Sequence, residues 1–164
     1  MIFTPDLSTK YSWLTRVSEY DMSILKDIFD DAETKRFLPE LYELLDVPDG
    51  IHKFVSTFEL YAQNDEGYLW GIKHNGVLIG FVAVMDLSYV PAIFYAMHPA
   101  YRSQGFMKDA ISAVLDYLEK YTQCHNVSTD VYKENSVSIH ILKQLGYSVC
   151  KEDDDKVYML KMFV

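Results

Sequence analysis

The strongest constraint on the fold of this chain is a pair of apolar segments that flank His74-Asn75-Gly76. Residues 68–73 and 77–86 are both strand-like, and an Asn-Gly pair between two such runs is a strong signal of a β-hairpin. A third strand is predicted over residues 92–97. The apolar run from Val77 to Met85 is also far shorter than the roughly 20 residues that a membrane span needs. We therefore expect an antiparallel sheet in the middle of the chain and no membrane segment.

The sequence on either side of this hairpin alternates between helix and strand patterns. Ser18 predicts the start of one helix and Gly146 the end of another. Helical spacing of apolar residues predicts four helices, over residues 19–37, 51–63, 105–120 and 136–145. In the last of these, Val137, Ile141 and Leu145 are expected to face inward. Further strands are predicted over residues 11–17, 127–132, 147–150 and 157–162.

Hairpins and helical crossovers in one chain predict an α/β fold with a mixed, mostly antiparallel β-sheet and helices on both of its faces. A length of 164 residues fits a single domain over residues 1–164. A hydrophobic content of 49% excludes a disordered chain. Residues 1–6 lack the pattern of a secretory signal, and Cys124 and Cys150 are too few for a disulfide framework. We therefore expect a cytoplasmic protein.

The charge of the chain is strongly acidic and unevenly distributed. Lys and Arg total 15 against 24 Asp and Glu, a net charge of −9, which argues against a nucleic-acid partner. Residues 1–69 hold 14 acidic and 6 basic side chains, net −8, and residues 70–164 hold 10 and 9, net −1. Two interpretations stay open: the acids cover solvated helix faces, or they attract a cationic ligand.

The segment that carries most chemical information runs from Met97 to Met107, where a strand ends, a turn follows and a helix begins near Gly105. The first amides of a helix lack internal partners and bind phosphate well. Because Gly105 has no Cβ, a phosphate can approach the backbone closely there. The same pattern also serves as a plain connection between a strand and a helix, so the motif alone leaves both interpretations open.

Two motifs in this order resemble the signatures of the GNAT superfamily of N-acetyltransferases. Arg102, Gly105 and Met107 stand at the three defined positions of its phosphate loop, [Gln/Arg]-x-x-Gly-x-[Gly/Ala], although Met107 departs from the pattern. The second signature is matched by the segments 135–138, Asn-Ser-Val-Ser, and 145–147, Leu-Gly-Tyr. The resemblance covers residues 13–162 and is closest to the branch of ribosomal-protein N-terminal acetyltransferases. It implies a helical acceptor-side region over residues 1–69 and a sheet that binds acetyl-CoA over residues 70–164.

The resemblance implies where acetyl-CoA binds. Its pyrophosphate would lie on the loop at the start of the central helix, formed by Arg102, Ser103, Gln104, Gly105, Phe106 and Met107. Its pantetheine arm would pair with the strand end Tyr95, Ala96 and Met97, where that strand diverges from the strand over 127–132. Asn135 would touch the same arm. An Asn before a helix is also a good N-cap, and the two roles are compatible.

The implied reaction is a direct attack of an amine on the acetyl thioester. By analogy, the backbone amide of Met97 would stabilise the oxyanion and Ser138 would protonate the leaving thiolate. Asp86 is the candidate for the base that deprotonates the amine. Two departures weaken the transfer of mechanism: Leu142 stands where many members have a tyrosine acid, and Ala92 stands where the related branch often has Glu.

Other functions stay in competition with this N-acetyltransferase hypothesis. A non-catalytic acyl-CoA-binding module fits the departures at Leu142 and Ala92, and a protein-interaction domain would keep the fold without a cofactor. The five His residues show no metal-ligand spacing, so no metal site is expected. The expected partners are acetyl-CoA and an amine, either a cationic small molecule or a protein N-terminus. The resemblance allows a homodimer, although no residue argues for one.

Overall fold

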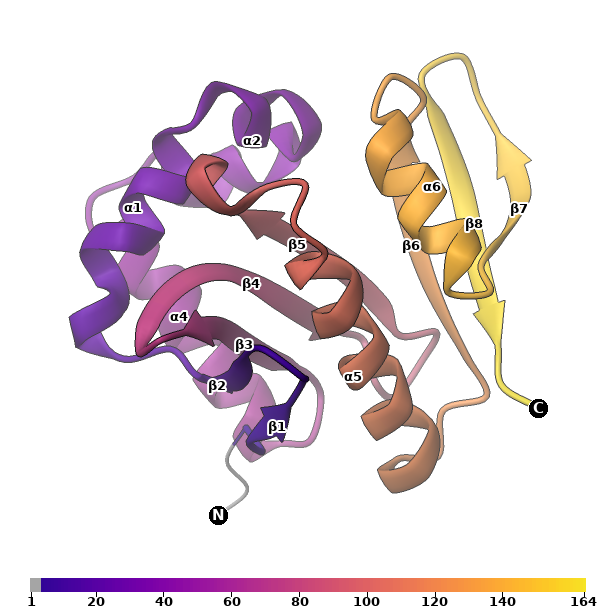
Figure 1. The fold of residues 1–164 in the computed structure, drawn as a ribbon, viewed down its shortest axis with the longest axis horizontal. Helices are drawn as coiled ribbons and strands as arrows, with labels where there is room; N and C mark the ends of the chain where they lie inside the picture. Colours follow the sequence, from indigo (N-terminus) through magenta and orange to yellow (C-terminus); the bar gives the residue numbers. More distant parts are fainter. Residues whose placement is uncertain (1–3) are drawn as a thin grey trace.

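The computed structural model describes residues 4–164, in which eight strands form one sheet in the order β1-β2-β3-β4-β5-β6-β8-β7 (Figure 1). Residues 1–3, half of the segment expected to lack a secretory signal, lie outside the described part. The strands are β1 (Leu7–Ser8), β2 (Trp13–Arg16), β3 (Tyr68–His74), β4 (Val77–Met85), β5 (Ala92–Met97), β6 (Asn126–Tyr132), β7 (Ser148–Glu152) and β8 (Lys156–Met162). The α-helices are α1 (Met22–Asp30), α2 (Ala32–Phe37), α3 (Tyr42–Leu45), α4 (Gly50–Gln63), α5 (Phe106–Tyr121) and α6 (Ser136–Gln144).

The predicted hairpin is confirmed as β3 and β4, which pair in antiparallel register up to His74 opposite Val77. The two loop residues, Asn75 and Gly76, have φ angles of 52° and 79°. Positive φ at both positions is what the tight turn between right-twisted strands needs, and Asn and Gly tolerate it best. The Asn-Gly signal therefore predicted the hairpin turn, while the register of the two strands shifts at an irregularity between Ile72 and Lys73.

Strands β5 and β6 are the parallel pair at the centre of the sheet, and they separate soon after they meet. Their ladder holds one pair, Ala92 opposite Ser128, within the described residues. The Thr129 hydroxyl donates to the Ile93 carbonyl at 2.9 Å. Beyond that point the two strands diverge, and Figure 1 shows the sheet opening into two halves there. The predicted divergence of these strands is thus confirmed, and the last residues of β5 face the opening.

Helices cover both faces of the sheet, as predicted. On one face, α5 and α6 pack on a core that includes Trp70, Ile79 and Val127. On the other face, α1 and α4 pack on a second core, which is rich in aromatic residues and includes Phe54, Phe81 and Leu25. No helix in residues 4–164 is long and apolar enough to cross a membrane. The prediction of a single α/β domain with a mostly antiparallel sheet is confirmed.

The helix predicted over residues 19–37 is wrong as a single element. Ser18 does start it, with the backbone amide of Ser18 donating to Asp21, but a 3-10 turn η1 (Glu19–Asp21) precedes α1. The chain then breaks at Asp31, whose backbone is extended with ψ 134°. The Asp31 carboxylate accepts a hydrogen bond from the Thr34 amide at 3.1 Å, so it caps a new helix, α2. The apolar spacing continued across the break, which hid it.

The inward face predicted for α6 is also wrong. Ser138 and Leu142 are the buried residues of this helix, while Val137 is 66% exposed. Ile141 and Leu145 are only partly buried. Spacing alone allows two adjacent apolar stripes on this helix, and packing against the sheet selects the stripe that contains Leu142.

This correction predicts the energetics of two substitutions. Leu142→Ala should lower the free energy of unfolding by about 2–5 kcal/mol, because it leaves a cavity around a side chain that is fully buried. Val137→Ala should change it by less than about 0.5 kcal/mol, because that side chain is largely exposed. Urea unfolding of both variants checks this, and a larger loss in Val137→Ala would contradict the observed helix face.

Candidate functional site

A cavity of about 230 Å³ lies where β5 leaves β6, and we call it the splay pocket. It is bordered by α2, the end of β5, the loop before α5, the first turn of α5 and the start of α6. The residues predicted to bind acetyl-CoA all line it, together with Ser138: Tyr95, Ala96, Met97, Arg102, Ser103, Gln104, Gly105, Phe106, Met107, Asn135 and Ser138. Three segments that are far apart in the sequence therefore meet at one cavity.

The loop before α5 is shaped by local backbone contacts. A short turn, η3 (Pro99–Tyr101), starts where His98 accepts a hydrogen bond from the Ala100 amide at 3.1 Å. Gly105 has φ 86° and is the residue that precedes α5. A Cβ atom placed on Gly105 would meet no atom within 4 Å. The N-terminus of α5 thus faces open space in the splay pocket, where a helix start attracts an anion.

Arg102 connects this loop to the helices on the other side of the splay pocket. Its guanidinium lies 2.6 Å from the Asp31 carboxylate and 2.8 Å from that of Glu33. Partial burial disfavours ionisation of Asp31, but hydrogen bonds from Arg102 and Thr34 outweigh it and hold the Asp31 pKa below its ordinary value. Two carboxylates therefore compensate the charge of Arg102, and the residue fixes the loop against the break between α1 and α2.

The far wall of the splay pocket holds a contact between two hydroxyl groups. The phenol of Tyr95 on β5 forms a hydrogen bond with the hydroxyl of Ser138 on α6. Burial raises the pKa of Tyr95 to about 12, against a smaller opposite effect of the bond to Ser138. Asn135 caps α6, because its side-chain oxygen accepts from the Ser138 amide at 3.3 Å. The capping interpretation of Asn135 is confirmed, and the residue still faces the splay pocket.

Asp86, the predicted base, does not join this site. It is exposed, it has φ 59° and it lies in the turn after β4. Because β4 and β5 are antiparallel, the end of β4 lies beside the start of β5, with Met85 opposite Ala92. The splay pocket is at the other end of β5, around Met97. The prediction placed Asp86 near the cleft because it follows a strand, but it did not take into account that β4 runs opposite to β5.

Sequence reasoning missed eight lining residues of the splay pocket, four of which lie on α2 or directly after it. The missed lining residues are Glu33, Thr34, Phe37, Leu38, Tyr101, Lys108, Val137 and Ile141. The helix break at Asp31, which a capping Asp followed by Thr34 could have signalled, turns α2 toward the pocket. Val137 was expected in the core, but it lines the pocket instead.

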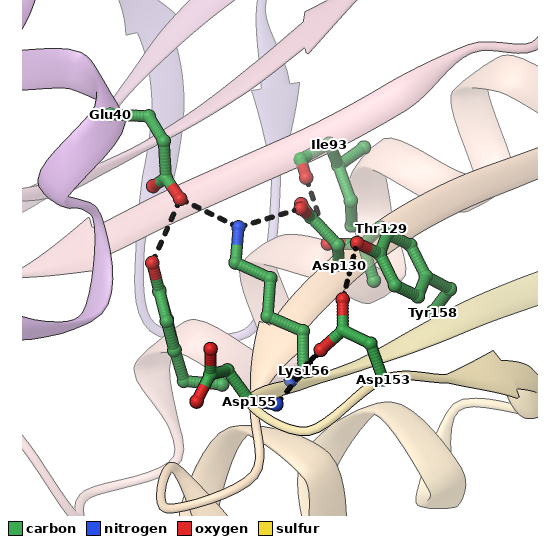
Figure 2. A network of polar contacts seen from close by, with 9 residues as sticks. Glu40, Ile93, Thr129, Asp130, Asp153, Asp155, Lys156 and Tyr158 are labelled. Atoms are coloured by element: carbon green, nitrogen blue, oxygen red, sulfur yellow. Dashed lines mark hydrogen bonds and ion pairs between the residues drawn. The ribbon is translucent and has the colours of Figure 1, made fainter.

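A polar network joins the two halves of the sheet on the side of Glu40, in the turn η2 (Pro39–Leu41). Figure 2 shows the Lys156 ammonium between the carboxylates of Glu40, at 2.7 Å, and Asp130, at 3.0 Å. Burial opposes the charge of Lys156, but these hydrogen bonds outweigh it and raise the Lys156 pKa. The Tyr132 phenol also donates to Glu40, at 2.9 Å. These contacts tie the segment after α2 to β6 and β8 and so limit how far the halves can separate.

The residues of this site contain no metal centre. Within residues 4–164 no group of three or more His, Cys, Asp or Glu side chains could hold a metal ion.

The contact between Arg102 and Asp31 predicts a pH-dependent stability. Because folding lowers the Asp31 pKa, the stabilisation is present above the unfolded value near 3.9 and is lost as pH falls through the folded value. Asp31→Asn keeps a capping oxygen but loses the charge, so it should cost about 1 kcal/mol at neutral pH. Urea unfolding should show this difference closing as pH falls below the unfolded value. As a control, Asp30→Asn at the neighbouring position should leave the free energy of unfolding nearly unchanged, because Asp30 is in an exposed ion pair with Lys26.

Known proteins are similar to this chain in sequence. The family model of the acetyltransferase (GNAT) domain matches residues 13–148. The uncharacterized N-acetyltransferase YoaA of Bacillus subtilis (strain 168) is 24% identical over 160 residues, which covers 94% of this chain and 88% of YoaA.

Solved structures agree on the fold. An acetyltransferase of the GNAT family from Bacillus anthracis superposes with a TM-score of 0.80 at 16% identity, covering 96% of this chain and 98% of that one. The ribosomal L7/L12 α-N-protein acetyltransferase RimL, solved with coenzyme A, superposes with a TM-score of 0.81 at 13% identity. The match covers 97% of this chain and 98% of RimL. With both motifs at one pocket and the family model matching most of the chain, the protein belongs to the GNAT acetyltransferase family.

Proposed function

We propose that this protein transfers the acetyl group of acetyl-CoA to a primary amine. The observation that carries the proposal is the convergence of the predicted donor-binding residues on the splay pocket, at the point where β5 leaves β6. Free backbone groups on a strand edge and the N-terminus of a long helix meet there. A ligand with an extended amide-bearing arm and a pyrophosphate fits both features.

In this proposal the pyrophosphate lies on the first amides of α5, around Gly105. The open space above Gly105 supports this position, and Lys108 on the same border adds positive charge. The pantetheine arm pairs with the free edge of β5 between Tyr95 and Met97, as an added strand would. Arg102, bound by Asp31 and Glu33, serves by fixing the loop rather than by contacting phosphate.

The proposed reaction is a direct transfer. The neutral amine attacks the thioester carbonyl, so that a C–N bond forms and the C–S bond breaks. The Met97 amide stabilises the oxyanion, and the Ser138 hydroxyl gives its proton to the leaving sulfur. The proton released by the amine leaves through water, because Asp86 lies at the far end of β5. The product is an amide and the free thiol of coenzyme A.

For the acceptor, we propose a cationic small molecule or a basic protein N-terminus. The net charge of −8 in residues 1–69 supports a cation, and α2 brings the Glu33 carboxylate to the border of the splay pocket. RimL, which shares the fold, acts on a protein N-terminus by its name. Both acceptor classes therefore belong in the same screen.

A non-catalytic acyl-CoA-binding module is the second candidate. The observation in its favour is Leu142, which occupies the position of the usual tyrosine acid and is fully buried in the core. Such a module would bind acetyl-CoA and show no turnover with any amine. A protein-interaction domain without a cofactor would bind no acetyl-CoA at all.

The first test is calorimetric titration with acetyl-CoA. We expect micromolar binding to the wild type and its loss in Gly105→Glu, because a carboxylate would occupy the phosphate position. Gly76→Glu is the matched control: Gly76 also has a positive φ, 79°, and nothing within 4 Å of a Cβ, but it lies on the β3–β4 turn. The control should bind normally. Absence of wild-type binding at millimolar ligand would reject both acyl-CoA hypotheses.

The second test asks whether acceptor charge matters. With spermidine or a lysine-rich hexapeptide as acceptor, the acceptor KM should rise several-fold between about 50 and 500 mM salt, because salt screens the acidic surface. Over this range the Debye length falls from roughly 14 Å to roughly 4 Å. A peptide with uncharged side chains should show a smaller rise. A KM for spermidine that does not depend on salt would contradict the cationic acceptor, and no turnover with any amine would favour the binding module.

A further inference from the structure

The hydrogen bond between Tyr95 and Ser138 joins the two halves of the opened sheet. Tyr95 belongs to β5, and Ser138 lies in the first turn of α6, 43 residues later. Both side chains line the splay pocket. Ser138 is 7% exposed, so its hydroxyl has little access to water outside the pocket. The orientation of this hydroxyl is therefore controlled by protein groups.

The partners of Ser138 restrict what its hydroxyl can do. A serine in a helix commonly bonds back to a carbonyl one turn earlier, but here the phenol of Tyr95 is the recorded partner of its hydroxyl. A serine hydroxyl carries one hydrogen. If Ser138 donates to Tyr95, that hydrogen is occupied; if Tyr95 donates, it is free to point into the pocket. A phenol is a stronger acid than an alcohol, which favours Tyr95 as the donor.

The fold itself does not require a buried phenol in this region to have a partner. Tyr147 is 4% exposed, and its phenol oxygen has no hydrogen-bond partner within residues 4–164. Burial raises the pKa of Tyr147, and a smaller contribution comes from Tyr95, so the two phenols lie within electrostatic reach. Burial keeps Tyr95 protonated at neutral pH, which preserves it as a donor. The contact of Tyr95 with Ser138 is thus specific.

We propose that Tyr95 is a positioning residue: its phenol donates to the Ser138 oxygen and turns the Ser138 hydrogen toward the sulfur of coenzyme A. This inference rests on the proposed function and on the role given there to Ser138. During transfer, the C–S bond breaks and the Ser138 proton moves to sulfur. The proton that the amine releases returns through water to the Ser138 oxygen, which Tyr95 stabilises meanwhile. Tyr95 itself keeps its proton, so the step balances without another reactant.

The decisive experiment needs no acceptor. Coenzyme A is bound to the protein, and the ionisation of its thiol is followed by the ultraviolet absorbance of the thiolate against pH. A hydrogen bond to sulfur favours the thiolate, so Tyr95→Phe and Ser138→Ala should each raise the bound thiol pKa by about one unit. The double variant should match Ser138→Ala alone, because Tyr95 acts through Ser138.

A matched control separates this effect from a general loss of a buried phenol. The phenol of Tyr68 is buried and donates to Asp65 at 2.6 Å, and Tyr68 is not among the lining residues of the splay pocket. Tyr68→Phe should leave the bound thiol pKa unchanged, even if it lowers stability. Tyr95→Phe should also lower kcat about tenfold while the KM for acetyl-CoA stays within twofold, using spermidine or the lysine-rich hexapeptide.

Each remaining outcome overturns a defined part of the inference. If Ser138→Ala raises the thiol pKa and Tyr95→Phe does not, Tyr95 has no positioning role while the proposed function stands. If Ser138→Ala leaves the bound thiol pKa low, another group forms the hydrogen bond to sulfur and the inference fails. This outcome is decisive even if the Tyr95→Phe variant does not fold. If the bound thiol pKa is higher in the double variant than in Ser138→Ala, Tyr95 acts on the sulfur directly. Absence of coenzyme A binding to the wild type would instead reject the proposed function.

Discussion

The structure depends on the point where the hydrogen bonding between β5 and β6 stops. One backbone pair, Ala92 with Ser128, and the bond from Thr129 to Ile93 hold these strands together before they diverge. A continuous ladder would satisfy the backbone of β5 and close the sheet. Because it ends early, the last residues of β5 have no ladder partner from β6 within residues 4–164, and they line the splay pocket. Their backbone groups need a partner, and an extended ligand is the kind of partner that a strand edge selects.

An opened sheet needs other contacts to hold its halves at a fixed distance. Here a shared apolar core spans the two halves, and polar contacts from the segment after α2 add to it. Arg102 binds Asp31 and Glu33, which fixes the loop before α5, while Lys156 bonds Glu40 and Asp130, which ties η2 to β6 and β8 (Figure 2). Each exposed ion pair contributes little alone, but these are partly buried and share partners. They place the acidic N-terminal region beside the splay pocket.

The motifs at the centre of the chain predict the observed structure because they are local. The turn at Asn75-Gly76, the helix start at Gly105 and the cap at Asn135 each depend on the backbone preferences of neighbouring residues, which the sequence carries directly. The break at Asp31 is local too, but the apolar spacing across it resembled one helix. The inward face of α6 failed for a different reason, since only the sheet decides between Val137 and Leu142.

What the sequence determined by itself was the β3–β4 hairpin, the start of α5, the cap of α6 and the family resemblance, because these follow from short-range patterns. What only the tertiary structure decided was which distant groups meet. Asp86 lies far from the splay pocket because antiparallel strands reverse direction. Helix α2 borders the pocket because the chain turns at Asp31. Tyr95 forms a hydrogen bond with Ser138 across the opening. Contacts between separate elements depend on packing and charge across the whole molecule, which no local pattern encodes.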